Sequence, residues 1–182
     1  MNALGNRLAA VLLLVFAVVS SARALDKNDW DDISNVGALS LMGAAVITPT
    51  AKGDWDGLGQ AALSIGSAGA LAEVLKQTFP ERRPDNSDNK SFPSGHTALS
   101  FASATTLHRR YGWQAGLPAY ALATVVGIGR ERSNEHHWYD VVAGAALGTA
   151  SGWLFTDAFN DKVKLVPWAD SKGGGVIVAV TW

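Results

Sequence analysis

The stretch RERSNEHHWYD, residues 130–140, places two adjacent histidines among charged side chains, between two long apolar segments rich in alanine and glycine. Two more polar clusters, at residues 76–84 and 90–97, also interrupt apolar segments. All three clusters fall where a helix is expected to begin or end, and the unpaired backbone groups of helix ends allow a site to be built there. The sequence therefore predicts a bundle of helices with its polar chemistry gathered at helix ends.

Outward from these clusters, small and apolar residues recur at helical spacing, and Pro49 is expected to end the first helix. The predicted helices are residues 33–47, 58–79, 94–111, 115–129 and 134 or 135 to 159. Residues 163–168 and 176–182 favour β-strands, and the polar, glycine-rich residues 169–175 between them predict a hairpin. The expected fold class is all-α, a bundle of about five helices followed by a short C-terminal β-hairpin.

The first 24 residues are typical of a secretory signal peptide. Arg7 gives a short basic start, residues 8–20 are apolar, and Ala22-Arg23-Ala24 is a small-residue cleavage site. An apolar core of this length is short for a membrane span, which takes about 17 to 25 residues. We expect cleavage after Ala24 and export to the periplasm or cell envelope, with an uncleaved anchor as the alternative. The mature chain would then comprise a helical domain at residues 25–160 and a tail at residues 161–182.

Composition excludes several classes of function. Loss of the signal peptide removes two of the 15 Lys and Arg residues and none of the 16 acids, so the net charge falls from −1 to −3. A mildly acidic chain is a poor nucleic-acid binder. The sequence contains no cysteine, which excludes disulfides, thiolate metal sites and a cysteine nucleophile. The mean hydropathy of +0.10 favours a soluble bundle, with peripheral contact to a membrane as a further expectation.

The cluster at residues 90–97 has the features of a helix start. Ser94 is a natural N-cap, and Gly95 removes a side chain where the first free N–H groups emerge. Helix starts of this kind bind anions. His96 lies in the first turn, where the positive end of the helix disfavours a protonated imidazole and a bound anion would favour it. The alternative is an ordinary capped helix with a histidine on its surface.

The opening stretch has the spacing of an oriented histidine. His136 and Asp140 are four residues apart, so on a helix both would lie on one face. Asp140 could then accept a hydrogen bond from one ring nitrogen and leave the other free to act as a nucleophile. His137, three residues from Asp140, also satisfies helical same-face geometry, so periodicity alone leaves both histidines open. A salt-bridged helix start is the alternative without chemistry.

The three clusters together suit phosphoryl transfer. The cations Lys76, Arg83 and Arg130 could hold phosphate oxygens, and this reaction depends mainly on positioning and charge stabilisation. One histidine could attack phosphorus while the other protonates the leaving oxygen. His108 is isolated, and the sequence contains no H-x-x-x-H pair or acidic loop with the spacing of metal ligands. We therefore expect no metal and no cofactor.

The ordered motifs resemble a known family. The spacings K-x6-R-P, P-S-G-H and R-x5-H-x3-D are similar to the three-part signature of the type 2 phosphatidic acid phosphatases and vanadium haloperoxidases, and they fall within residues 58–159. The resemblance implies a helical bundle in which His136 forms a phosphohistidine, Asp140 orients it and His96 protonates the leaving group. Phosphate would be bound by Lys76, Arg83, Ser94, Gly95 and Arg130.

The same resemblance selects His136 over His137, and it leaves Arg132 and Glu135 as expected rim charges. Gly129 stands where the family usually has a serine, which puts one hydroxyl contact to phosphate in doubt. The implied activity is metal-independent hydrolysis of a phosphomonoester or diphosphate, first of a lipid in the cell envelope and next of a soluble phosphomonoester.

Two alternatives stay open. A vanadate-dependent haloperoxidase would use the same pocket, with His136 binding vanadate as a cofactor, whereas vanadate would inhibit a phosphatase. Such haloperoxidases are generally much longer chains. The other alternative is a catalytically silent envelope protein, against which the near-complete signature argues.

Overall fold

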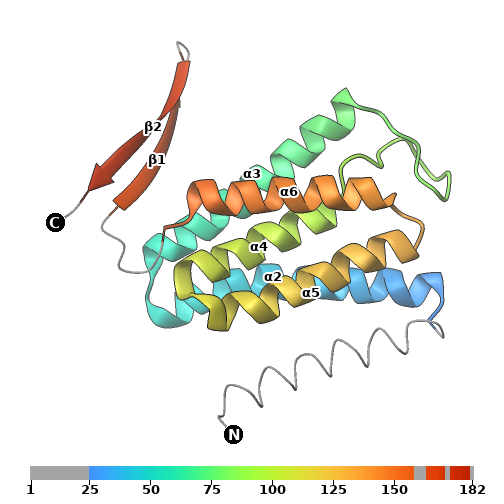
Figure 1. Cartoon of the computed structure of the whole chain (residues 1–182), viewed down its shortest axis with the longest axis horizontal. Coiled ribbons are helices and arrows are strands. Elements are labelled where there is room, and N and C mark those ends of the chain that lie inside the picture. The colour runs from blue at the N-terminus through green and yellow to red at the C-terminus, as the bar shows by residue number, and fades with distance from the viewer. Residues whose placement is uncertain (1–24, 158–162, 171–172, 181–182) are drawn as a thin grey trace, which may run out of the picture.

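The computed structural model describes residues 25–157, 163–170 and 173–180, so the predicted signal peptide lies outside the described residues. The described part contains five helices followed by two strands, which confirms the expected fold class (Figure 1). Their order is α2 (Lys27–Lys52), α3 (Trp55–Thr78), α4 (Gly95–Tyr111), α5 (Trp113–Arg132), α6 (Trp138–Phe155), β1 (Val163–Asp170) and β2 (Gly173–Val180).

The first described helix, α2, is longer than predicted at both ends. It begins at Lys27 because Asp26 forms a capping box, accepting hydrogen bonds from the backbone N–H groups of Asn28 and Asp29. The expectation that Pro49 ends the helix was wrong. Pro49 lies buried in the last turn, where it removes a single backbone hydrogen bond, and the helix ends at Gly53 with a positive φ of 66°.

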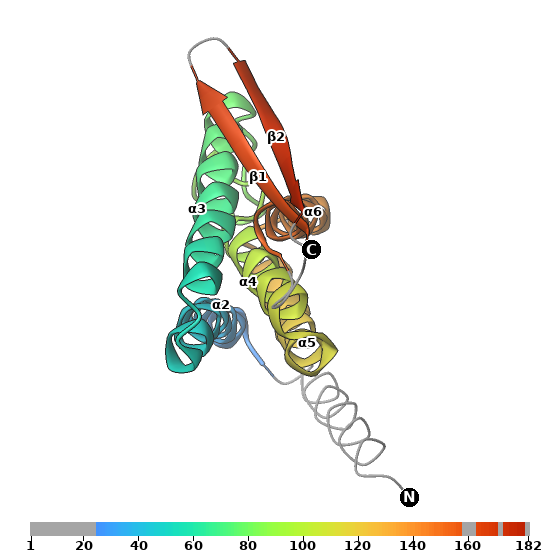
Figure 2. The same ribbon diagram turned by 90° about the vertical axis from the view of Figure 1, so that its left-hand side faces the viewer.

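Helix α4 lies at the centre of the bundle and packs against the other four described helices (Figures 1 and 2). The core around it is built largely from alanines, so helix backbones approach closely. Three glycines on α6 face α4 one turn apart, at Gly144, Gly148 and Gly152. A Cβ at Gly148 would lie 2.1 Å from the carbonyl oxygen of Ala98, so α6 rests directly on the backbone of α4.

A buried ion pair joins α4 to the turn between α2 and α3 at one end of the bundle. The Asp54 carboxylate accepts from Arg110 Nε at 2.7 Å and from the Tyr111 hydroxyl at 2.8 Å. Hydrogen bonding from Arg110 lowers the pKa of Asp54 to about 2. The same carboxylate caps α3 through the N–H of Gly57. This end of the bundle is therefore held by charge as well as by packing.

The hairpin extends beyond the helices, next to the C-terminal end of α6 (Figure 1). Its strands are antiparallel, pairing Val163 with Val180 and Asp170 with Gly173. The glycines at residues 173–175 belong to β2, so the connection is shorter than predicted. The β-region therefore includes residues that composition alone had assigned to a turn.

Helices α2 and α3 are long and apolar enough to cross a membrane by length and composition, a test that buried core helices also pass. Their outer faces carry exposed large apolar side chains, namely Val36, Leu39, Val46 and Ile47 on α2 and Leu63, Leu71 and Val74 on α3. Exposed apolar side chains gathered into a large patch mark a face that contacts a membrane or another protein.

Candidate active site

The starts of α4 and α6 meet in the bundle. The backbone N–H of Ser94, at the N-cap of α4, donates to the carbonyl oxygen of Asp140 in the first turn of α6 at 3.0 Å. Both residues are fully buried. The polar clusters that the sequence placed at two separate helix starts thus lie side by side, and the positive ends of both helices serve one region.

Ser94 occupies the predicted N-cap position, but its side chain makes no capping hydrogen bond. Its Oγ instead accepts from Thr97 Oγ1 at 2.9 Å. The first-turn N–H groups of α4 are therefore not capped by the Ser94 side chain and can serve an anion. A Cβ at Gly95 would have Lys76 Cε as its nearest neighbour, at 3.9 Å, so the lysine side chain passes over this helix start.

His136 precedes α6 instead of lying on it, so the same-face argument from the sequence was wrong. Asn134 adopts a positive φ of 61°, and the chain turns so that the N–H of His136 donates to the Arg130 carbonyl at 3.1 Å. His136 is 2% exposed, and its Nδ1 lies 3.8 Å from Oδ2 of Asp140. That distance is too long for a hydrogen bond, although catalytic hydrogen bonds often close only when substrate is bound.

His137 is the N-cap of α6 and engages Asp140 directly. Its backbone N–H donates to Asp140 Oδ2 at 2.8 Å, and its ring Nδ1 lies 3.2 Å from the same oxygen. Ser91 Oγ donates to that oxygen at 2.5 Å. Among the described residues, Asp140 Oδ1 and His136 Nδ1 are buried without a hydrogen-bond partner. Asp140 thus stands between two histidines, bound by one and within reach of the other.

The two arginines share a carboxylate. Glu135 accepts from Arg83 Nη1, and its Oε2 lies 3.1 Å from Nη2 of Arg130. Arg130 is 4% exposed and also pairs with Asp31 on α2. Glu135, expected as a rim charge, is 27% exposed, and its carboxylate between two guanidinium groups occupies a place suited to a phosphate oxygen.

The three predicted cations act electrostatically on both histidines. Burial, followed by the charges of Lys76, Arg130 and Arg83, lowers the pKa of His136 to about 2. Burial and the same cations, Arg130 first among them, lower the pKa of His96 to about 4. Lys76 itself donates to the Lys90 carbonyl oxygen at 2.6 Å. The structure therefore brings the three cations and two histidines into one partly buried region, which also holds the carboxylates of Glu135 and Asp140.

Gly129, which replaces the usual serine, allows α2 to approach. A Cβ there would lie 2.9 Å from Ser34 Cβ and 3.0 Å from the Trp30 carbonyl oxygen. Ser34 Oγ instead lies 3.3 Å from Nη1 of Arg130 and can accept from it. The hydroxyl of Ser34 on α2 thus contacts Arg130, whereas Gly129, next to Arg130 in the chain, has no hydroxyl to offer.

Sequence reasoning missed Ser91, Glu135 and Asp31 as parts of this region. Ser91 and Glu135 adjoin recognised motifs, and that proximity was the available signal. Asp31 reaches Arg130 across 99 positions of sequence, and no local pattern marks such a contact. Arg132, in contrast, is exposed and pairs with Glu131 at 3.3 Å, as expected of a rim charge.

A groove of about 1060 Å³ runs beside the charged region. Glu131, Arg132 and Trp138 line it next to the site, and it continues along apolar side chains of α5 and α6. Further apolar residues lining it are Leu25, Trp30, Phe101, Val125, Ile128, Val141 and Val142. Its apolar lining suits an apolar chain, whereas none of the predicted site residues lines it.

Known proteins share this fold. A PAP2-type phosphatidylglycerolphosphate phosphatase from Bacillus subtilis, described as transmembrane, aligns with a TM-score of 0.57 at 25% identity, covering 81% of this chain and 91% of that one. Aquifex aeolicus LpxE aligns with a TM-score of 0.61 at 23% identity, covering 70% of this chain and 82% of that one, which supports the fold.

Relatives and a family description agree with these structures. Lipid A 1-phosphatase of Porphyromonas gingivalis is 36% identical over 107 residues, covering 55% of this chain and 24% of that protein. Lipid A 4'-phosphatase of Helicobacter pylori is 28% identical over 120 residues, covering 60% of this chain and 61% of that protein. The chain therefore matches about a quarter of the first relative and three fifths of the second.

The PAP2 superfamily model matches residues 57–164, which hold every predicted site residue. By that match, which takes in more than half of its length, the chain belongs to the PAP2 superfamily.

Proposed function

We propose that the protein is a metal-independent phosphatase that hydrolyses a phosphomonoester or diphosphate of a lipid in the cell envelope through a phosphohistidine. One observation carries the proposal: three cations act on two histidines with strongly lowered pKa values, where the starts of α4 and α6 are joined by a hydrogen bond. Histidines with strongly perturbed pKa values, close to several charged groups, are typical of catalytic centres. The relatives named lipid A phosphatase support a lipid phosphate as substrate.

Substrate binding would begin with an exchange of anions. The substrate phosphate would displace the Glu135 carboxylate from Arg83 and Arg130 and take its charge-assisted hydrogen bonds. The N–H of Gly95 and the ammonium of Lys76, which passes over that helix start, would hold the remaining oxygens. The phosphate then lies between the two histidines, and its charge favours protonation of His96.

The first chemical step would transfer the phosphoryl group to His136. With its pKa lowered to about 2, His136 is neutral at physiological pH, as a nucleophile must be. Its Nε2 would form the bond to phosphorus as the bond to the lipid oxygen breaks, and protonated His96 would donate its proton to that oxygen. Asp140, 3.8 Å from Nδ1, would close on the ring as the ring becomes cationic.

The second step would return the enzyme to its starting state. His96, now neutral, would take a proton from a water molecule as the water oxygen attacks phosphorus and the P–N bond breaks. Inorganic phosphate then leaves, and His136 is again neutral. The proton that His96 gives to the lipid oxygen in the first step is thus regained from the attacking water in the second.

A lipid substrate at a membrane is supported by two surfaces. The groove beside the site offers an apolar path along α5 and α6 for an acyl chain. The outer faces of α2 and α3 expose large apolar side chains that could contact lipid. Together with the predicted signal peptide, these surfaces support an exported, membrane-associated enzyme of the periplasm or cell envelope.

The test uses the purified full chain. Phosphate release is measured from phosphatidate, phosphatidylglycerophosphate, undecaprenyl diphosphate, lipid A and a soluble monoester, with and without chelator. We expect lipid phosphates to be hydrolysed best, chelator not to reduce the rate, and vanadate to inhibit. His136→Ala and His96→Ala should each abolish most activity. With labelled substrate, His96→Ala should retain an acid-labile, base-stable phosphoenzyme that His136→Ala lacks. Unchanged phosphate release by both variants would refute the proposal.

A further inference from the structure

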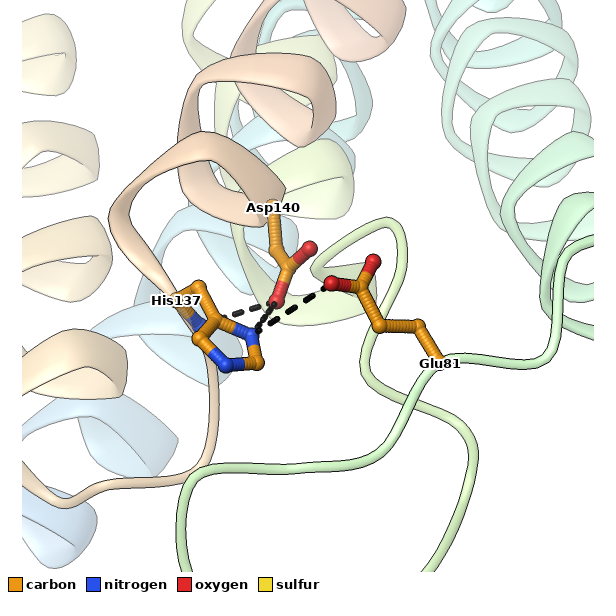
Figure 3. Close-up of side chains that lie close together, drawn as sticks. All are labelled: Glu81, His137 and Asp140. Carbon is orange, nitrogen blue, oxygen red and sulfur yellow. Dashed lines mark hydrogen bonds and ion pairs between the residues drawn. The ribbon is translucent and has the colours of Figure 1, made fainter.

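Three potential metal ligands lie together at the mouth of the site. Nδ1 of His137 is 3.2 Å from Oδ2 of Asp140 and 3.9 Å from Oε1 of Glu81, and the three ligand atoms lie within 4.8 Å of one another. The imidazole and the two carboxylates point toward one another from α6 and from the loop after α3 (Figure 3). Glu81 lies 56 positions before His137, so the sequence contains no ligand spacing that would reveal the cluster.

The chain holds Glu81 in this position from several sides. Its backbone N–H donates to the Asn89 carbonyl oxygen at 3.0 Å, and the N–H of Ser91 donates to the carbonyl oxygen of Glu81 at 2.9 Å. The Tyr139 hydroxyl donates to its carboxylate. The loop carrying Glu81 is therefore tied to the segment that precedes α4, and its side chain is presented to His137 rather than left to move freely in solvent.

We propose that Glu81, His137 and Asp140 form a site for a divalent transition-metal ion of the zinc class, and that the bound ion inhibits the enzyme. Zinc binds imidazole nitrogen and carboxylate oxygen at about 2.0 to 2.2 Å in a tetrahedron, which separates the ligand atoms by about 3.3 to 3.5 Å. The histidine and aspartate atoms are already at that separation, 3.2 Å. The Glu81 carboxylate needs to close by about 1 Å, and water can fill the fourth position.

An independent observation points to unused ligand capacity at this place. Asp140 is 0% exposed, yet its Oδ1 has no hydrogen-bond donor among the described residues. A buried carboxylate with an unpartnered oxygen is costly, and a cation bound at Oδ2 would compensate the charge of the same carboxylate. His137 and Glu81 have side chains 31% and 33% exposed, so an ion can enter from solvent and reach the buried ligand.

Inhibition follows from the ligand that the ion shares with the reaction, and this step rests on the proposed function. Asp140 Oδ2 is the oxygen nearest to His136 Nδ1. Once it is bound to zinc, it can no longer close on the ring as the phosphohistidine forms. Zinc should therefore slow phosphate release, and chelator should raise the rate of a preparation that carries zinc. A metal-dependent reaction would respond to chelator in the opposite direction.

The site is tested first by binding alone. The full chain is stripped with chelator, desalted and titrated with Zn²⁺ by isothermal calorimetry. We expect one ion per chain, with affinity at least tenfold weaker in His137→Asn and in Glu81→Gln. Glu73→Gln, which changes an exposed glutamate outside the cluster, is the matched control and should bind as the original protein does. Absence of binding, or equal affinity in all variants with native melting curves, overturns the site.

Inhibition is tested separately on phosphate release, with each variant normalised to its own zinc-free rate. The zinc concentration that halves the rate of the original protein should agree with its measured zinc affinity. In His137→Asn and Glu81→Gln that concentration should be at least tenfold higher. Zinc that binds as expected without slowing release would overturn the inhibitory role. A protein that releases no phosphate even in chelator would refute the proposed phosphatase instead, while the calorimetry still decides the metal site.

Discussion

Gly144 controls how closely the two helix starts of the site approach. A Cβ at this position would lie 2.4 Å from the carbonyl oxygen of Ser94 and 3.2 Å from Thr97 Cβ. The carbonyl cannot rotate away easily, because it accepts the α4 hydrogen bond from Ala98 at 3.0 Å. Gly144→Ala must therefore push the start of α6 away from the start of α4.

The size of the effect follows from that contact. Ordinary contacts begin at 3.4 Å, so the contact at 2.4 Å requires a displacement of about 1 Å. Misplacement by about 1 Å can cost about 100-fold in rate, the equivalent of about 2.7 kcal/mol. Overpacking costs about 1 to 3 kcal/mol of stability, offset by about 1 kcal/mol from the better helix propensity of alanine. We expect kcat/KM to fall about 100-fold, with stability lower by about 0 to 2 kcal/mol.

Two control variants separate loss of geometry from loss of stability. In Gly152→Ala the new Cβ would meet Thr105 Cβ at the same 2.4 Å, two turns further along α6 and away from the site. It should lower stability similarly and change kcat/KM by less than about threefold. Gly66→Ala on α3 meets nothing within 4 Å, so stability should rise by up to about 1 kcal/mol through helix propensity alone.

The assays are phosphate release under kcat/KM conditions and denaturant unfolding on the same preparations. If Gly144→Ala keeps its kcat/KM within threefold of Gly152→Ala, the close approach at Gly144 does not set the geometry of the site, and the reasoning fails. Equal, large losses in both variants would assign the effect to the fold as a whole.

Three further changes test charge within the bundle. Because His96 has its pKa lowered from 6.5 to about 4, its neutral form is favoured by folding, so stability is complete above pH 6.5 and lost as pH falls toward 4. Between pH 7 and pH 5 the His96 part of this loss should be about 2 kcal/mol in denaturant unfolding, and His136, whose pKa is lowered to about 2, adds a similar loss. His96→Gln should therefore lose about 2 kcal/mol less than the original protein over this range. Glu135→Gln should lower the inhibition constant of inorganic phosphate about threefold to tenfold, since the arginines lose an internal competitor; weaker inhibition would contradict this. Asp54→Ala removes the carboxylate that pairs with buried Arg110 and should cost about 3 kcal/mol, seen as a lower melting temperature; an unchanged value would show that the pair is replaceable.

The sequence predicted the number and order of the helices and strands, but it placed some helix ends wrongly. Apolar periodicity and prolines were sufficient for five helices and a hairpin, because each helix buries a small-residue face in the core. Periodicity failed at His136, where the positive φ of Asn134 and the cap formed by His137 and Asp140 delay the start of α6. It also failed at Pro49, which is accommodated in a last turn.

Site residues that belong to short sequence motifs could be predicted, whereas contacts between segments distant in the sequence could not. The helix start at Ser94 lies where its motif indicated, and His136 and Asp140 lie close together, although His136 precedes the helix instead of sharing a face of it. The contact of Asp31 with Arg130 and that of Glu81 with His137 depend on how distant parts of the chain fold together. No spacing along the chain encodes those distances.

If the proposed function holds, the carboxylate of Glu135 also bears on how the enzyme would leave most phosphate groups of a membrane unbound. Phosphodiester headgroups carry a single negative charge, no more than the carboxylate already held by Arg83 and Arg130. A terminal phosphate carries about −1.5 to −2 at pH 7 and competes better for the same arginines. The internal anion would thus act as a charge threshold, leaving bulk bilayer lipids outside and admitting lipids that end in a phosphate. In Glu135→Gln that threshold falls, and inhibition by phosphodiester lipids should become measurable.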